Sequence, residues 1–207
     1  MSKQNYNVQM HGIIDALAAE KKPKLLLHCC CACCATSVCG LLEKHFELTL
    51  YYYNPNIFPE SEYFKRLDSV KKFLKARGTE IALIAAEYNP DEFYRVTSAF
   101  EDTREGGVRC GECIKLRLEE TAKLAKIGGY EYFASTLSVS PMKNAVVING
   151  IGKVLGDEYG IKYLVNDFKK EDGYKRSVEL SREYGLYRQD YCGCRASLIK
   201  SEEKKNG

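Results

Sequence analysis

Hydrophobic residues in the first half of the chain form short apolar runs separated by longer amphipathic stretches. The short runs have the length and the turn-bounded ends of buried strands, and they cover residues 24–28, 47–53 and 79–85. The longer stretches carry apolar residues at helical spacing, and they cover residues 9–20, 35–45 and a segment from Pro59 to Gly78. Proline in a first turn and glycine just past the last turn are usual helix boundaries. The pattern therefore predicts helices alternating with strands.

The same alternation continues through the second half of the chain. It predicts helices over residues 110–126 and 144–158, with strands over 130–134 and 161–165. Two more helical stretches flank a Cys-Gly-Cys segment near the C-terminus. Because the strands are short and apolar on both faces, we expect an α/β fold in which helices cover a mostly parallel, Rossmann-like sheet. With no linker or repeat in the pattern, residues 1–207 are expected to form a single domain, with a core of about 24–200 and a helical C-terminal part.

Two polar or cysteine-rich segments directly follow predicted strands. One begins after His28, and the other is the hydroxyl-rich segment 135–144. Ligands of parallel sheets bind beyond the carboxyl ends of the strands, so both segments are expected at the functional edge. Segment 135–144 suits phosphate binding or the capping of the helix that follows it.

The composition narrows the class of protein. Hydrophobic residues make up 45% and charged residues 29% of the chain, as in soluble globular proteins. No apolar run approaches the roughly 20 residues that span a bilayer, and the first residues lack the features of a secretion signal. We therefore expect a cytoplasmic protein with no membrane partner. Since the cytosol keeps thiols reduced, its ten cysteines should serve chemistry rather than act as disulfide staples.

The cysteines gather in three motifs, a distribution that favours metal ligation or redox exchange. They are a cluster of six between Cys29 and Cys39, the pair Cys110 and Cys113, and the pair Cys192 and Cys194. Within the first cluster, Cys39 is typical of a buried core cysteine. The first two motifs together supply the four sulfurs that a four-iron cluster requires, and zinc accepts the same number. Spacing alone leaves both metals open.

The net charge of +3 is small, but its distribution is uneven. Residues 162–200 hold nine Lys or Arg against six Asp or Glu, with six aromatic residues interleaved. Such a mixture can bind phosphates and stack on bases. A solvated amphipathic helix with core tyrosines has the same composition, so both interpretations stay open at this point.

Six ordered blocks, spread over about residues 24–198, resemble the epoxyqueuosine reductase QueH family. They are Leu-Leu-His-x-Cys-Cys-Ala-x-Cys at 26–34, Tyr-Asn-Pro-Asn-Ile at 53–57, Arg-Cys-x-x-Cys at 109–113, Ser-Val-Ser-Pro-x-Lys-Asn at 138–144, Gly-Tyr-Lys-Arg-Ser-Val-Glu-Leu-Ser at 173–181 and Gly-Leu-Tyr-Arg-Gln-Asp-Tyr-Cys-Gly-Cys at 185–194. The resemblance implies an oxidoreductase that removes the epoxide oxygen of epoxyqueuosine at the tRNA wobble position, giving queuosine. The implied partners are that tRNA and an unidentified electron donor.

The resemblance also implies roles for particular cysteines. The ligands of a [4Fe–4S] cluster would be Cys30, Cys31, Cys110 and Cys113. Cys192 and Cys194 would form a redox pair that closes to a disulfide, or would bind an additional iron ion together with Cys34. The chain departs from the family pattern at Cys33, where the family commonly has proline, and at the added Cys29. These departures leave the exact ligand set among residues 29–34 open.

Further residues are expected beside the substrate. The candidate proton donors are Tyr53, Asp190, Tyr191 and His28. A histidine in such a position is more often a hydrogen-bonded core residue. The cations expected to face the tRNA backbone are Lys169, Lys170, Lys175, Arg176, Arg182 and Arg188.

Two alternatives to a reductase remain at this point. A cluster-containing tRNA sulfur-transfer enzyme would need a phosphate loop after the first strand, where this chain has cysteines. A zinc-stabilised RNA-binding module would explain four thiols and the basic C-terminal part, but it leaves Cys192 and Cys194 without a role.

Overall fold

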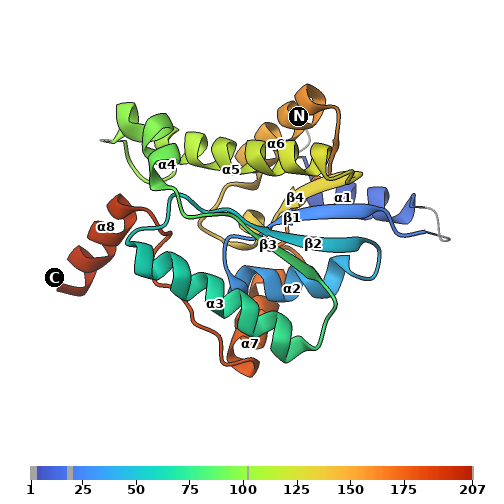
Figure 1. Cartoon of the computed structure of the whole chain (residues 1–207), viewed down its shortest axis with the longest axis horizontal. Helices are drawn as coiled ribbons and strands as arrows, with labels where there is room; N and C mark the ends of the chain where they lie inside the picture. Colours follow the sequence, from blue (N-terminus) through green and yellow to red (C-terminus); the bar gives the residue numbers. More distant parts are fainter. Residues whose placement is uncertain (1–3, 18–20, 102, 207) are drawn as a thin grey trace.

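A five-stranded parallel sheet forms the centre of the computed structural model, which describes residues 4–17, 21–101 and 103–206 (Figure 1). In chain order the strands are β1 (Lys24–His28), β2 (Glu47–Tyr52), β3 (Ala82–Ala85), β4 (Tyr132–Ser135) and β5 (Lys162–Tyr163). They lie in the order β3-β2-β1-β4-β5, and every adjacent pair is parallel. The predicted α/β fold is thus confirmed. The order changes direction between β1 and β4, and ligands of such sheets bind at this switch point.

Helices cover both faces of the sheet. Figure 1 shows α2 (Ala32–Leu42), α3 (Glu60–Arg77) and α7 (Gly173–Glu183) on one face, and α4 (Pro90–Thr97), α5 (Val108–Ile127) and α6 (Ala145–Tyr159) on the other. Successive residues of β1 pack into the two opposite layers: Leu25 and Leu27 join the core beneath α2 and α3, whereas Leu26 joins the core beneath α5 and α6. Burial on both faces explains the unbroken Leu-Leu-Leu run.

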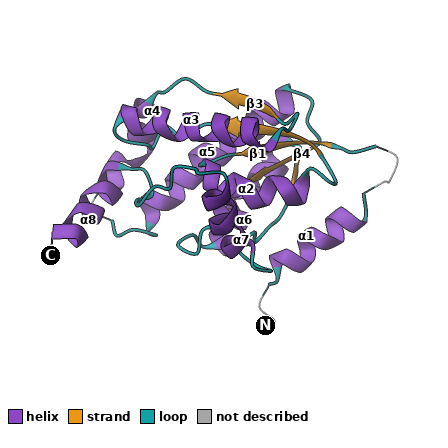
Figure 2. Cartoon of the chain, turned by 90° about the horizontal axis from the view of Figure 1, so that it is seen from below, coloured by secondary structure: helices purple, strands orange, loops and turns teal. Residues whose placement is uncertain are grey.

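The two terminal helices differ in how they join this body. α1 (Tyr6–Asp15) contributes Met10 and Ile14 to the core, which therefore begins before residue 24. α8 (Arg195–Asn206) stands apart from the layers in both views (Figures 1 and 2), and of its residues with described side chains only Ser197 is buried. Among the described residues, no helix is both long and apolar enough to cross a membrane.

Several boundaries differ from those predicted. α1 ends at Asp15 rather than residue 20, and residues 18–20 lie outside the described part. β5 covers only residues 162–163 of the predicted 161–165. α4 and the short 3₁₀ helix η1 (Ser98–Phe100) were not predicted. A second 3₁₀ helix, η2 (Thr136–Val139), follows β4.

The start of α2 is the difference that matters for the site. The helix begins at Ala32 rather than Ala35, with Cys31 as its N-cap residue. The Cys31 sulfur accepts a hydrogen bond from the backbone amide of Cys34, a capping role usually filled by an oxygen side chain. The early start places Cys33 and Cys34 in the first turn.

Candidate metal and redox site

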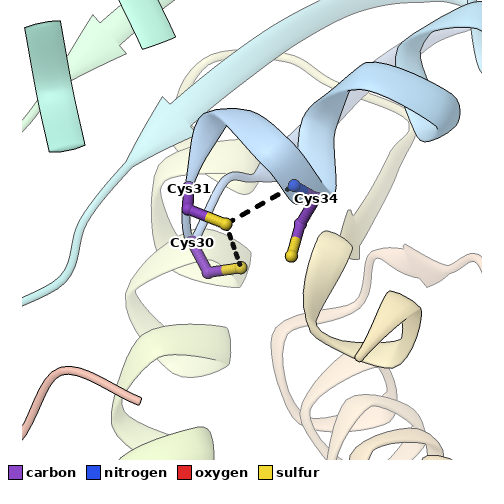
Figure 3. A group of neighbouring side chains, drawn as sticks. All are labelled: Cys30, Cys31 and Cys34. Atoms are coloured by element: carbon purple, nitrogen blue, oxygen red, sulfur yellow. Dashed lines mark hydrogen bonds between the residues drawn. The ribbon is translucent and has the colours of Figure 1, made fainter. Parts of the chain in front are cut away.

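Three thiols gather where β1 ends (Figure 3). Cys30 follows the strand, Cys31 caps α2, and Cys34 lies in the first turn of that helix. Their sulfurs all lie within 4.8 Å of one another, and the Sγ atoms of Cys30 and Cys31 are 3.8 Å apart. In the described part of the chain, no other three His, Cys, Asp or Glu side chains lie close enough to share one metal ion. We refer to Cys30, Cys31 and Cys34 as the thiol triad.

The triad is arranged to hold a negative charge on Cys31. Hydrogen bonds from the thiols of Cys30 and Cys34 keep the pKa of Cys31 well below its usual value, although burial opposes this. The same contact with Cys31 raises the pKa of Cys30 to about 12. The amide at the start of α2 adds to the effect, since helix N-termini stabilise thiolates.

Thr136 joins the triad to the neighbouring strand end. Its hydroxyl donates to the Cys30 sulfur at 3.3 Å and accepts the backbone amide of Cys30 at 3.2 Å. Thr136 follows β4, so the contact spans the switch point of the sheet. Segment 135–144 also provides caps, because Ser135 accepts from the amide of Leu137 and Asn144 accepts from that of Val146.

The other two cysteine motifs meet in a small recess beside a larger cleft. Cys110 and Cys113 enter this recess from the first turns of α5, and Cys192 and Cys194 enter it from the segment before α8. The cleft has a volume of about 330 Å³. Both hollows share part of their lining, namely Asn56, Arg117, Lys143 and Cys192. The cleft is also lined by Cys30, Cys33 and Cys34, so all three motifs converge on one place.

Arg117 is a buried cation between these motifs. It lies one helical turn after Cys113 and donates from Nε to the carbonyl of that residue at 3.1 Å. Its side chain lines both hollows, and within the described residues no carboxylate lies within 4.0 Å of it. Burial lowers the pKa of Arg117, but the thiols of Cys113, Cys192 and Cys30 raise it further, so the guanidinium stays charged. The four-residue spacing from Cys113 is a signal in the sequence that would have found it.

Lys143 gives the Cys-Gly-Cys segment a second cation. Its Nζ donates to the Cys192 sulfur at 3.0 Å. Burial raises the pKa of Cys192, but Lys143 and Arg117 outweigh burial and hold that pKa below its usual value. Cys113, in contrast, has its pKa raised to about 11 by burial. The recess therefore favours a thiolate at Cys192.

Arg66 holds the Cys-Gly-Cys segment from the opposite side. This residue of α3 is 2% exposed and pairs with Glu62 at 2.7 Å. It also donates to the backbone carbonyls of Tyr191, at 3.3 Å, and Cys192, at 3.1 Å. Sequence analysis did not find this residue, because a charged side chain on a surface helix carries no sign of burial.

Gly193 has to be glycine in this arrangement. Its φ is +134°, a region that other residues rarely adopt. A Cβ atom there would lie 3.0 Å from Asn56 Nδ2 and 3.2 Å from Arg66 Nη1. The two thiols are thus separated by a residue whose close approach to α3 needs a missing side chain.

His28 is a core residue that stays neutral. Its Nε2 lies 3.1 Å from the carbonyl of Tyr53, which can only accept, so Nε2 carries the hydrogen. Nδ1 then accepts from the hydroxyl of Ser135 at 2.8 Å. Burial lowers the pKa of His28 to about 3. The interpretation of His28 as a hydrogen-bonded core residue is confirmed.

The other predicted proton donors have different surroundings. The hydroxyl of Tyr53 binds Glu92 of α4, and Tyr53 is not among the described residues that line the cleft. Asp190 lines the cleft, but its contact with Lys205 lowers its pKa, so it is ionised at neutral pH. Tyr191 also lines the cleft, and its hydroxyl donates to the carbonyl of Phe58 at 2.5 Å. Geometry thus gives none of them a free proton facing the cleft.

The predicted tRNA-facing cations are spread over and around α7. Lys170, Lys175, Arg176, Arg182 and Arg188 are exposed. Lys169 is half-buried, binding Asp167 and the carbonyl of Ser138. Of the six, only Arg188 lines the cleft in the described structure, and the lysines of α8 that line it were not predicted.

Comparison with known proteins gives a consistent family. The family model described as "Epoxyqueuosine reductase QueH" matches residues 25–200. A relative of that name from Staphylococcus epidermidis is 39% identical over 205 residues, covering 96% of this chain and 86% of its own. One from Streptococcus pyogenes serotype M1 is 40% identical, covering 93% and 77%, and one from Thermotoga maritima is 41% identical, covering 74% and 81%.

A solved structure shares the fold at low sequence identity. It is the U34-tRNA thiolase NcsA from Methanococcus maripaludis with its [4Fe–4S] cluster, which is 14% identical with a TM-score of 0.50. The match covers 96% of this chain and 73% of the thiolase. The likeness supports the α/β architecture and, at this identity, nothing about the chemistry.

Proposed function

This chain belongs to the epoxyqueuosine reductase QueH family, and we propose that it removes the epoxide oxygen of epoxyqueuosine in tRNA by two-electron reduction, giving queuosine. In that reaction both carbon–oxygen bonds of the epoxide break and a carbon–carbon double bond forms. The oxygen takes up two protons and leaves as water, and the two electrons come from a donor outside this chain. The chain is accordingly an oxidoreductase.

The observation that supports this function most directly is the meeting of three cysteine motifs at the switch point of the sheet. A [4Fe–4S] cluster needs four thiolates, and thiols of the triad and of the adjoining recess supply more than four. When bound, the cluster would supply the electrons for the reduction. We propose Cys30, Cys31, Cys110 and Cys113 as its ligands, two from each group.

The surrounding charges fit an anionic group of this kind. Thiolate ligands bring negative charge into a partly buried place, which is costly unless cations balance it. Arg117 and Lys143 lie between the motifs and supply two positive charges. Lys143 also carries a proton at Nζ beside Cys192, and its pKa is raised because Cys192 outweighs burial. We propose Lys143 as a group that holds a proton next to the reacting substrate.

Cys34, Cys192 and Cys194 are available for a second role. Cys192 lines both hollows, Cys34 lines the cleft and Cys194 lines the recess. A pair that closes to a disulfide stores the second electron pair of a two-electron reaction, and an additional iron held by these thiols would serve the same end. Cys34 lies in the triad with Cys30 and Cys31, so the iron alternative requires the first motif to be shared.

Two carboxamides are placed to orient the substrate. The Oδ1 atom of Asn56 and the Oε1 atom of Gln189 are buried and have no hydrogen-bond partner in the described structure, and both residues line the cleft. A buried acceptor without a partner loses free energy. We propose that donors on the modified base fill these positions.

The substrate and location follow from the family. We propose tRNA carrying epoxyqueuosine as the partner, with Lys170, Lys175, Arg176, Arg182 and Arg188 as exposed cations that contact its backbone, together with Lys169. We also propose that the protein works in the cytoplasm, where its ten free thiols stay reduced.

The test is conversion of epoxyqueuosine in isolated tRNA, measured by mass spectrometry of nucleosides, with anaerobically purified protein and a chemical reductant. Iron and sulfide are quantified on the same sample. We expect conversion and about four sulfides per chain. The variants Cys31→Ser and Cys113→Ser should lose sulfide and activity, whereas Cys39→Ala, in the core away from both hollows, should keep them. Colourless, zinc-containing protein without activity would instead favour the RNA-binding module.

A further inference from the structure

Helix α8 lacks the usual means of attachment to a protein body. Among its described side chains only Ser197 is buried, and its apolar residue Ile199 is 48% exposed. A helix that is polar all round is not held by a buried apolar stripe. One face of α8 nevertheless lines the cleft, through residues at helical spacing: Ser197, Lys200, Ser201 and Lys204. Ammonium and hydroxyl groups on one face are the donors that bind phosphate.

We propose that this face of α8 binds the phosphate backbone of the substrate RNA and forms one wall of its binding site. The proposal rests on the proposed function, because it takes the RNA loop that carries the modified base as the occupant of the cleft. It moves part of the RNA contact from α7, where the sequence predicts it, to the last helix of the chain.

Charges around the cleft favour a polyanion. Lys143 and Arg188 line it together with the two lysines of α8, against the carboxylates Glu105 and Asp190. Both carboxylates already have α8 lysines as partners: Lys200 lies 3.8 Å from Glu105, and Lys205 contacts Asp190. These pairs are exposed and hence weak, so an incoming phosphate can compete for the lysines. Tyr174, 41% exposed on the same lining, offers a ring for base stacking.

The start of α8 connects this face to the reacting thiols. The amides of Ser197 and Leu198 donate to the carbonyl of Cys194, and the amide of Gly193 donates to the hydroxyl of Ser197. Lys200 is six residues after Cys194, a rise of about 9 Å along a helix. A phosphate on Lys200 would therefore lie within about one nucleotide's reach of the recess, and the backbone bound there belongs to the residues beside the modified base.

The experiment compares binding of a fluorescently labelled, unmodified tRNA transcript to holoprotein by anisotropy at several salt concentrations. The test variant is Lys200→Ala with Lys204→Ala. The matched control is Lys71→Ala with Lys75→Ala, an exposed pair of the same spacing on α3 that does not line the cleft. We expect binding about tenfold weaker for the α8 variant, with the salt dependence reduced by about 0.7 per lost phosphate contact. The control should bind like the wild type.

The outcomes separate this proposal from the proposed function. Unchanged affinity and salt dependence in the α8 variant, with tRNA bound tightly by the wild type, would overturn the α8 proposal alone. If Lys175→Ala with Arg176→Ala then weakens binding, the RNA crosses α7 instead. A wild type that binds no tRNA and converts no epoxyqueuosine, despite a full cluster, would refute the proposed function itself. Circular dichroism of each variant checks that the fold is retained.

Discussion

The thiol triad and the Cys192–Cys194 segment line the same cleft but are held in place by different means. The triad is built by five consecutive residues, because a strand end and a helix N-cap put Cys30, Cys31 and Cys34 together. The Cys192–Cys194 segment has no regular structure of its own and is held by contacts far away in the sequence. Arg66, Asn56 and Lys143 supply those contacts.

The difference shows how one protein combines a local site with an assembled one. A local arrangement forms as soon as its helix forms, and it tolerates changes elsewhere. An assembled arrangement depends on every long-range partner, so its stability is coupled to that of the fold. We expect the two regions to respond differently to substitution, pH and alkylation.

The largest expected effect is on the ion pair that holds the assembled region. Arg66→Ala leaves Glu62 buried without its partner, which costs about 3–5 kcal/mol. Arg77→Ala removes a more exposed pair with Glu43 on the same helix and should cost about 0–1 kcal/mol. Urea unfolding of the two apoprotein variants measures both values. Equal losses would mean that Arg66 does not hold the segment as described.

The next effect concerns the glycine between the two thiols. Gly193→Ala forces a side chain into a positive-φ position next to Asn56 and should cost about 1–3 kcal/mol. Gly150→Ala, in α6 with open space around its Cβ position, should instead gain about 0.5–1 kcal/mol. Thermal unfolding of the pair checks the opposite signs, and a neutral Gly193→Ala would show that the segment can move away from α3.

A pH effect is expected at the end of β1. Unfolded histidine titrates near about 6.5, whereas His28 in the fold has a pKa of about 3. Between these values the unfolded chain binds the extra proton, so this contribution to stability is complete above about 6.5 and is lost as the pH falls towards 3, by about 1.4 kcal/mol per pH unit. Unfolding free energies at several pH values should show this slope in the wild type, and His28→Gln should lack it.

The smallest effect is a difference in thiol reactivity between the regions. In apoprotein, Cys192 has a lowered pKa because Lys143 and Arg117 outweigh burial, whereas hydrogen bonds from Cys30 and Cys31 raise that of Cys34. Each pKa unit changes the thiolate fraction about tenfold. Iodoacetamide at neutral pH should therefore alkylate Cys192 at least about tenfold faster than Cys34, as read by peptide mass spectrometry. Lys143→Met should slow Cys192 alone, and a preference for Cys34 would reverse the assignment.

Local patterns sufficed for most of the architecture. The strands at 24–28 and 47–52 were predicted almost to the residue, because apolar runs bounded by turn residues have few alternatives. The C-cap at Gly78 was also predicted, and the structure gives it a φ of +64°. The early start of α2 was missed, since a cysteine sulfur is an unusual N-cap acceptor.

The sequence by itself determined the alternation of strands and helices, the three cysteine motifs and the family. These depend on the order of residue types, which hydrophobic spacing and short motifs record directly. Only the tertiary structure decided that Arg117 and Lys143 stand between the motifs, that Arg66 is buried and that α8 lines the cleft. The reason is physical: the burial of a charge depends on which elements pack around it, and residues 126 positions apart, such as Arg66 and Cys192, meet only when the chain has folded.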